Sequence, residues 1–154
     1  MATVLHGIEG GIPLPFVIPG VKLGLANIIT LVALVMLGVP FALAVALMRT
    51  LLGALLVIGF GPTFLMSLSG ALLSWAVMSL LYRGLGKHLS LVGISVAGAV
   101  AHIAAQLTVA ALILKHPGTM MLFPVLMVSA VITGILVGIT AKYSLVSLQK
   151  IYSR

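Results

Sequence analysis

The side chains that could carry out chemistry are few in this chain, and their types exclude most kinds of catalysis. Glu9 is the only carboxylate residue in 154 residues, Asp and Cys are absent, and eight Lys and Arg residues give a formal charge of +7. An Asp-rich magnesium site, a reactive thiolate and a Ser–His pair with its acidic partner are therefore excluded. The chain also has no Gly-rich phosphate loop of the P-loop kind. Binding or transport is the remaining class of function, and no cofactor is indicated.

Arg49 is the most informative single residue, because it lies in the middle of an apolar stretch. A charge at the centre of a membrane helix costs about 2.5–3.5 kcal/mol on insertion scales, and such residues usually face a cavity or a partner. Its counter-ion would be Glu9, a group of carbonyls, a partner subunit or an anionic ligand. In the alternative interpretation, Arg49 extends to the headgroups, since it lies only about nine residues after Pro40.

Three further polar residues lie in apolar stretches. His102 and Gln106 are four residues apart and share one helix face, and Gly98 and Ala105 beside them leave room for a ligand or a close helix. A hydrogen-bonded pair that only holds two helices together is the alternative. Asn27, in the first predicted span, has the same two interpretations: a ligand contact, or a hydrogen bond that holds two helices together. The four His residues of the chain are dispersed and have no metal-ligand spacing, so no metal site is predicted.

The surrounding composition predicts an all-α, polytopic transmembrane helix bundle. The chain is 62% hydrophobic and 6% charged, whereas a soluble protein carries roughly a quarter charged residues. The apolar runs do not alternate with polar residues as barrel strands do, and the scattered bases form no contiguous face for nucleic acid. Five segments approach the length of about 20 residues that a spanning helix needs: about Lys22 to Leu37, Pro40 to Phe60, Thr63 to Tyr82, Leu91 to Leu114, and Met120 to Ala141.

These segments belong to a single integral membrane domain covering residues 1–154. Residues 1–21 are predicted to form a partial first helix and a Pro-rich outer loop, because their prolines and glycines interrupt a regular helix. Either the protein has five spans, or a first helix lies mostly upstream of Met1. Residues 142–154 are predicted to form a polar tail. Small residues at helical spacing, such as Gly70 with Ser74 and Gly134 with Gly138, favour close helix packing in lipid.

The basic residues predict the orientation. Five of them fall on the side that holds the tail (Arg83, Lys87, Lys142, Lys150 and Arg154), against Lys22 and Lys115 on the other side. Because cytoplasmic loops carry an excess of Lys and Arg, the tail side is predicted to be cytoplasmic, which puts the Pro-rich loop outside.

Several blocks of the chain resemble one bacterial membrane family. They are PGVKLGLANI at 19–28, Arg49 with Gly53, FGPTF at 60–64, SLSGA at 67–71, Gly93, GAVAH at 98–102 with Gln106, and Gly134 with Gly138. On these blocks the chain resembles the Gx transporter family, which is also labelled heptaprenyl diphosphate synthase component I. The resemblance covers nearly the whole chain from Ile12, and the block at 19–28 is the most specific part.

The resemblance implies a function in transport. The family is similar to the substrate-binding S components of energy-coupling factor (ECF) transporters, which are compact bundles of usually six helices in the bacterial cytoplasmic membrane. They capture vitamins or precursors and work with a transmembrane coupling subunit and two cytoplasmic ATPases. The chain departs from that pattern, because residues 1–21 are expected to hold only part of the first helix, which usually docks the coupling subunit. The second label implies the alternative, a non-catalytic membrane component of heptaprenyl diphosphate synthesis for isoprenoid quinones.

For the importer, we expect a small anionic or amphipathic substrate of the vitamin, isoprenoid or quinone-precursor type. Lys22 and Arg49 would attract its anionic group, and Asn27, His102 and Gln106 would supply hydrogen bonds. The loop from Pro13 to Pro19 would act as a lid. Glu9 is the only protein carboxylate that could neutralise Lys22 or Arg49.

The predicted orientation can be tested by cysteine labelling, because the chain has no natural cysteine. A Lys87→Cys variant in intact cells is expected to be protected from a membrane-impermeant thiol reagent and to react after the cells are permeabilised. Labelling from outside in intact cells would overturn the orientation.

Overall fold

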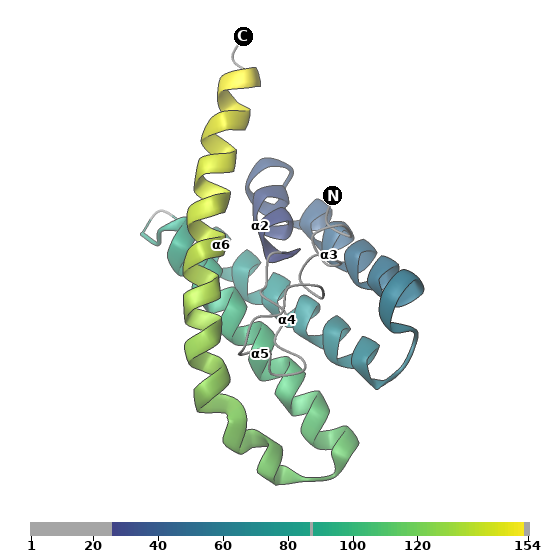
Figure 1. Ribbon diagram of the computed structural model, residues 1–154. Coiled ribbons are helices and arrows are strands. Elements are labelled where there is room, and N and C mark those ends of the chain that lie inside the picture. The colour runs from purple at the N-terminus through teal and green to yellow at the C-terminus, as the bar shows by residue number, and fades with distance from the viewer. Residues whose placement is uncertain (1–25, 87, 153–154) are drawn as a thin grey trace.

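The computed structural model describes residues 26–86 and 88–152, and all regular secondary structure in these ranges is helical (Figure 1). The predicted all-α class is therefore confirmed. In chain order the elements are α2 (Ala26–Met36), α3 (Val39–Gly53), the π-helix η1 (Ala54–Ile58), α4 (Pro62–Leu85), α5 (Leu91–Leu114), the 3₁₀-helix η2 (Pro117–Leu122) and α6 (Phe123–Tyr152).

Within residues 26–86 and 88–152, four helical segments are long and apolar enough to cross a membrane: Val39–Leu56, Pro62–Leu85, Leu91–Leu114 and Gly118–Leu148. The described part of the predicted first span is α2, whose 11 residues measure about 16 Å at 1.5 Å per residue. That length is about half of the 30 Å apolar layer, and Lys22 to Leu25 lie outside the described residues.

The helix ends follow from local backbone chemistry. Gly38, at a φ of +92°, turns the chain after α2, and a proline in the first turn of α3 needs no hydrogen bond there. Ser90 caps α5 by accepting a hydrogen bond from the Gly93 N–H at 3.1 Å. The predicted span from Leu91 to Leu114 therefore matches α5. By contrast, α6 does not end near Ala141, because no Gly or Pro interrupts residues 142–152.

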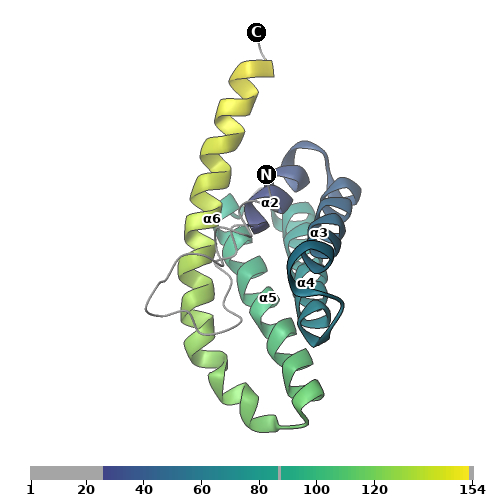
Figure 2. The ribbon, with the colours of Figure 1, turned by 45° about the vertical axis from the view of Figure 1, so that its right-hand side comes forward.

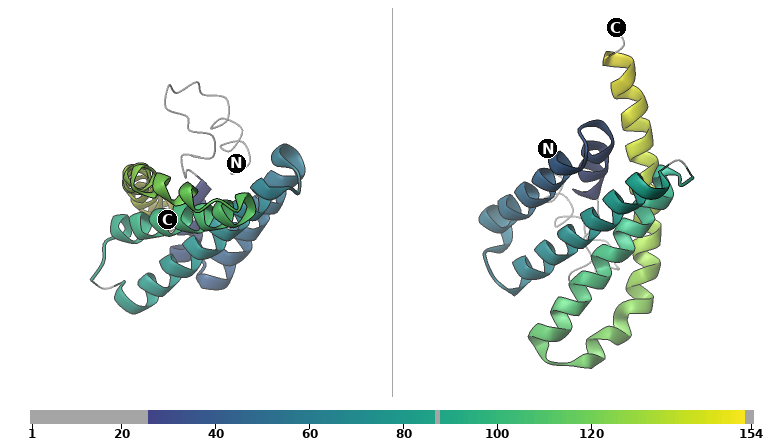
Figure 3. Two further views of the ribbon diagram at one scale, coloured as in Figure 1. Left: turned by 90° about the horizontal axis from the view of Figure 1, so that it is seen from below. Right: turned by 180° about the vertical axis from the view of Figure 1, so that it is seen from behind.

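The long helices form an antiparallel series in which α5 packs between α4 and α6, and α2 packs against α3 and α6 (Figures 1 and 2). The turn after α2, the turn after α4 and the C-terminal end of α6 lie toward one end of the bundle. The loops after η1 and after α5 lie toward the other end. The last turns of α6 extend past the other helices, as the view from behind also shows (Figure 3). The segment predicted to be a tail is therefore helical as far as Tyr152.

Glycines allow close contact between α5 and α6. A Cβ added at Gly134 would lie 2.7 Å from the Val96 Cα, and one at Gly138 would lie 2.6 Å from the Val92 Cα. These neighbours are backbone atoms that cannot move aside. The predicted packing role of this pair is confirmed, whereas Gly20 and Gly24, with the same spacing, lie outside the described residues.

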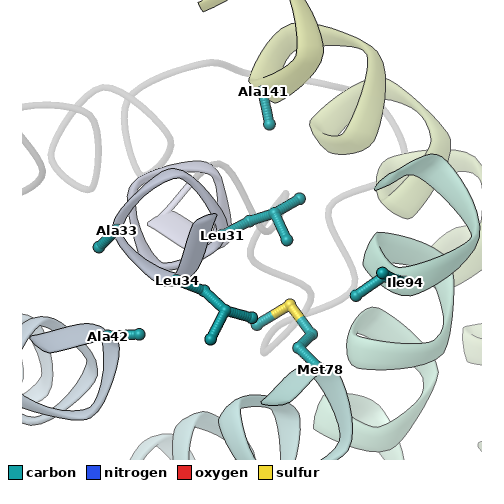
Figure 4. Close-up of a cluster of buried hydrophobic side chains, with 7 residues drawn as sticks. All are labelled: Leu31, Ala33, Leu34, Ala42, Met78, Ile94 and Ala141. Atoms are coloured by element: carbon teal, nitrogen blue, oxygen red, sulfur yellow. The ribbon is translucent and has the colours of Figure 1, made fainter. Parts of the chain in front are cut away.

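The buried side chains form two clusters. The first joins α2, α3, α4, α5 and α6 and consists of Leu31, Ala33, Leu34, Ala42, Met78, Ile94 and Ala141 (Figure 4). The second lies between α5 and the start of α6 and consists of Ala99, Ile103, Leu107, Leu126 and Ala130. Many other large apolar side chains are exposed, including Leu80, Leu112 and Met121, which suits a surface in contact with lipid.

The contact between α5 and α6 can be tested by a methyl group at Gly138. Gly138→Ala is expected to lower the stability of the folded protein in detergent by about 1–3 kcal/mol, because the added carbon overlaps backbone at Val92. Thermal unfolding followed by circular dichroism measures the loss. Gly84→Ala is the matched control, since a Cβ there meets no atom within 4 Å. Equal melting temperatures for both variants would contradict the close approach.

Candidate functional site

Arg49 and Asn27 are brought together by the antiparallel pair of α2 and α3. The Arg49 Nη2 donates a hydrogen bond of 2.8 Å to the Asn27 Oδ1. Asn27 is 5% exposed, so the guanidinium is held inside the bundle. This geometry argues against the alternative in which Arg49 extends to the headgroups.

The position of Arg49 along α3 places its charge deep in the apolar layer. The residue is ten positions after Val39, the first residue of α3, which corresponds to about 15 Å along the helix axis. This is half of the thickness of the hydrocarbon core. The only carboxylate residue of the chain, Glu9, lies outside the described residues, as do Lys22 and the loop from Pro13 to Pro19.

The chemistry of the pair fixes the orientation of the Asn27 amide. A guanidinium has only donors, so the group that faces Arg49 must be the amide oxygen. The Asn27 Nδ2, with its two N–H donors, is therefore directed away from Arg49. Apart from the bond between them, Arg49 and the Asn27 Nδ2 offer only N–H donors to a third group, and Arg49 adds a positive charge.

His102 and Gln106 share one face of α5, as predicted, and this face packs on α4 at Gly70. A Cβ added at Gly70 would lie 2.8 Å from the His102 Cε1 and 3.0 Å from the Gln106 Cγ. Gly70 is therefore needed to make room for both side chains. One turn away, the space next to Gly98 is filled by the Met78 side chain and by the Ser74 Oγ, so this glycine accommodates a neighbouring helix.

An apolar cluster separates these polar residues from the end of the bundle that holds the α2–α3 turn. Leu31, Met78 and Ile94, from α2, α4 and α5, belong to this cluster, and Figure 4 shows Leu31, Leu34, Met78 and Ile94 directed toward a common centre. One helical turn farther from that end, α2 carries Asn27 and α4 carries Ser74, and both are buried. Polar groups therefore occur directly below a layer of buried apolar side chains.

The sequence did not identify two fully buried hydroxyl groups in this region. Thr30 and Ser74 are each 1% exposed, and neither hydroxyl has a hydrogen-bond partner. Ser74 does not donate to a carbonyl of its own helix. Ser69 does so, donating to the Met66 carbonyl oxygen at 2.9 Å. A helical serine gives no sequence signal that separates these two outcomes.

Trp75 is a structural residue that the sequence also did not identify. Its indole Nε1–H donates to the Val39 carbonyl oxygen at 3.0 Å, which ties the first turn of α3 to α4. It is the only Trp of the chain, and a partly buried Trp usually finds an acceptor for its N–H. The bond helps to fix the helix that carries Arg49.

Hollows in the described part of the chain include two that Asn27 and Arg49 do not line. A groove of about 560 Å³ between α4 and α5 is lined mostly by apolar side chains, among them Leu72, Leu73, Trp75 and Val109. The second hollow, at the α4–α5 turn, is lined by Tyr82, Arg83, Gly84, Gly86 and His88. Within residues 26–86 and 88–152, no group of three or more metal-binding side chains gathers.

Comparison with known proteins identifies one family. A family model described as heptaprenyl diphosphate synthase component I matches residues 1–145. No curated protein and no solved structure shows a significant match to the chain.

Proposed function

The chain belongs to the heptaprenyl diphosphate synthase component I family, and we propose that it is a membrane subunit that captures a small anionic or amphipathic molecule. The molecule would be of the vitamin, isoprenoid or quinone-precursor type. The chain itself would catalyse no reaction, since it has a single carboxylate residue and no cysteine.

The observation that carries this proposal is the bond between Arg49 and Asn27. A charge in an apolar segment is stabilised by polar contacts, and the neutral Asn27 amide oxygen supplies one of them. This amide fixes the direction of the guanidinium and supplies no negative charge of its own. An anionic ligand is the chemical group that such a charge binds most strongly, because electrostatic attraction increases as the dielectric constant falls.

The mechanism would be that of an importer subunit similar to the S components of ECF transporters. The ligand would enter from the end of the bundle opposite the α2–α3 turn, and Arg49 and Asn27 would bind its anionic group. His102 and Gln106 would contact its remaining part. The layer of Leu31, Met78 and Ile94 would close the path beyond the site. Release would need partners, namely a transmembrane coupling subunit and two cytoplasmic ATPases, in a bacterial cytoplasmic membrane with the C-terminus inside.

A second candidate function follows from the description of the family itself. The chain would be a non-catalytic membrane component of heptaprenyl diphosphate synthesis, and a separate synthase subunit would be its partner. The two functions differ in what must accompany the chain: coupling and ATPase subunits for the importer, or a soluble prenyl synthase for the component. Affinity purification of the tagged chain from its native membrane distinguishes them.

The importer function predicts that Arg49→Ala abolishes uptake. The relevant solute is first identified as the one whose accumulation in cells requires the wild-type chain, by mass spectrometry of extracts with and without expression. Arg49→Ala is then expected to reduce this accumulation to the level of cells that lack the chain, because the anionic group loses its positive partner.

Arg83→Ala is the matched control, since Arg83 is exposed near the end of α4. Both variants should reach the membrane in wild-type amounts. Undiminished accumulation with Arg49→Ala would show that the ligand does not depend on this charge.

A further inference from the structure

The side-chain hydroxyl of Thr30 is buried but forms no hydrogen bond with the surrounding helices. The Thr30 side chain is 1% exposed and its Oγ1 has no hydrogen-bond partner. Other helical threonines of the chain donate to a carbonyl of their own helix: Thr50 to Ala46, Thr108 to Ala104, Thr133 to Ser129 and Thr140 to Leu136. A buried hydroxyl without a partner is unfavourable, so Thr30 requires a partner that the helices do not supply.

The position of Thr30 relates it to the Arg49–Asn27 pair. Thr30 lies three residues after Asn27 on α2, and side chains with this spacing are neighbours whose Cβ atoms are roughly 5–6 Å apart. Because α2 and α3 are antiparallel and Asn27 bonds to Arg49, the residue three positions after Asn27 lies opposite the residue three positions before Arg49. Thr30 therefore lies opposite Ala46, and Ala46 is fully buried. The Ala46 side chain offers no acceptor. The Thr30 hydroxyl therefore lies about one helical turn from Asn27 and donates to no other group.

The three residues together form a set of donors. Arg49 has only donors, Asn27 has its oxygen occupied by Arg49 and presents its Nδ2, and Thr30 has an uncommitted O–H. Such a set suits a ligand group with several acceptor oxygens and a negative charge. A phosphate or diphosphate group has more terminal oxygens than a carboxylate and accepts bonds from several directions.

We propose that Thr30 is a third donor in a phosphate-type oxyanion site, together with Arg49 and the Asn27 amide. The inference deepens the proposed function and rests on it, since it names the chemical class of the captured molecule. The phosphate group would belong either to a soluble molecule or to the headgroup of a lipid-like one.

Binding measurements on the purified full chain in maltoside detergent test the proposal. Inorganic pyrophosphate and phosphatidic acid are the two phosphate probes, and malonate is the carboxylate probe. Wild type is expected to bind at least one phosphate probe more tightly than malonate. Binding of pyrophosphate supports a soluble ligand, and binding of phosphatidic acid alone supports a lipid-borne one.

Thr30→Val, which keeps the shape and removes the hydroxyl, is expected to weaken phosphate binding about tenfold, the effect of one hydrogen bond to a charged group. Thr30→Ser keeps the hydroxyl and should bind within about twofold of wild type. Thr133→Val is the matched control, because its hydroxyl is bonded within α6. The melting temperature of ligand-free Thr30→Val should not fall, since no protein bond is lost.

Several results would overturn the inference. They are equal affinity of Thr30→Val and wild type for the phosphate probe, a preference for malonate, or no binding of either phosphate probe. If Arg49→Gln loses binding while Thr30→Val keeps it, only the role of Thr30 fails. The proposed capture function itself is judged separately, by the accumulation of solute in cells.

Discussion

The hydrogen bond between the Arg49 guanidinium and the Asn27 amide oxygen is the interaction on which the rest of the structure depends. It places a positive charge about halfway across the apolar layer, where an unsatisfied charge is strongly unfavourable. The Asn27 amide oxygen accepts a hydrogen bond from this guanidinium and fixes its direction.

The packing of the bundle serves to position this pair. Trp75 ties the start of α3 to α4, and small residues on α3, Ala42 and Ala46, are fully buried and form part of its inner face. On the other side of α2, α6 contributes Ala141 to the apolar cluster. α2 is therefore held between α3 and α6, at the position where Asn27 can reach Arg49. This holds although α2 is much shorter than the spanning helices.

Much of this architecture could be predicted from the sequence, because lipid imposes a simple pattern. Long apolar runs ended by Gly, Pro or polar turns gave the spans, and α5 matched from Leu91 to Leu114. Arg49 was recognisable as a candidate because a charge in such a run is rare. The continuation of α6 to Tyr152 was not predicted, since polar residues at a membrane boundary say little about where a helix ends.

The partners of the polar residues could not be predicted, because they depend on tertiary structure. Arg49 had four possible types of counterpart, and the amide of Asn27 was not among them. His102 and Gln106 were expected to share a face, but the need for Gly70 opposite them appears only once α4 and α5 are packed. Thr30 gave no signal, since a helical threonine normally bonds to its own backbone.

Native mass spectrometry of the Asn27→Asp variant tests most directly the proposal that Arg49 and Asn27 bind an anionic ligand. The substitution keeps the size of the side chain and supplies a carboxylate at the position that accepts from Arg49. Wild type released from detergent is expected to carry a bound anionic small molecule, and Asn27→Asp is expected to be empty and at least as stable to heat. An Asn27→Asp protein that retains the same molecule at wild-type occupancy would contradict the account.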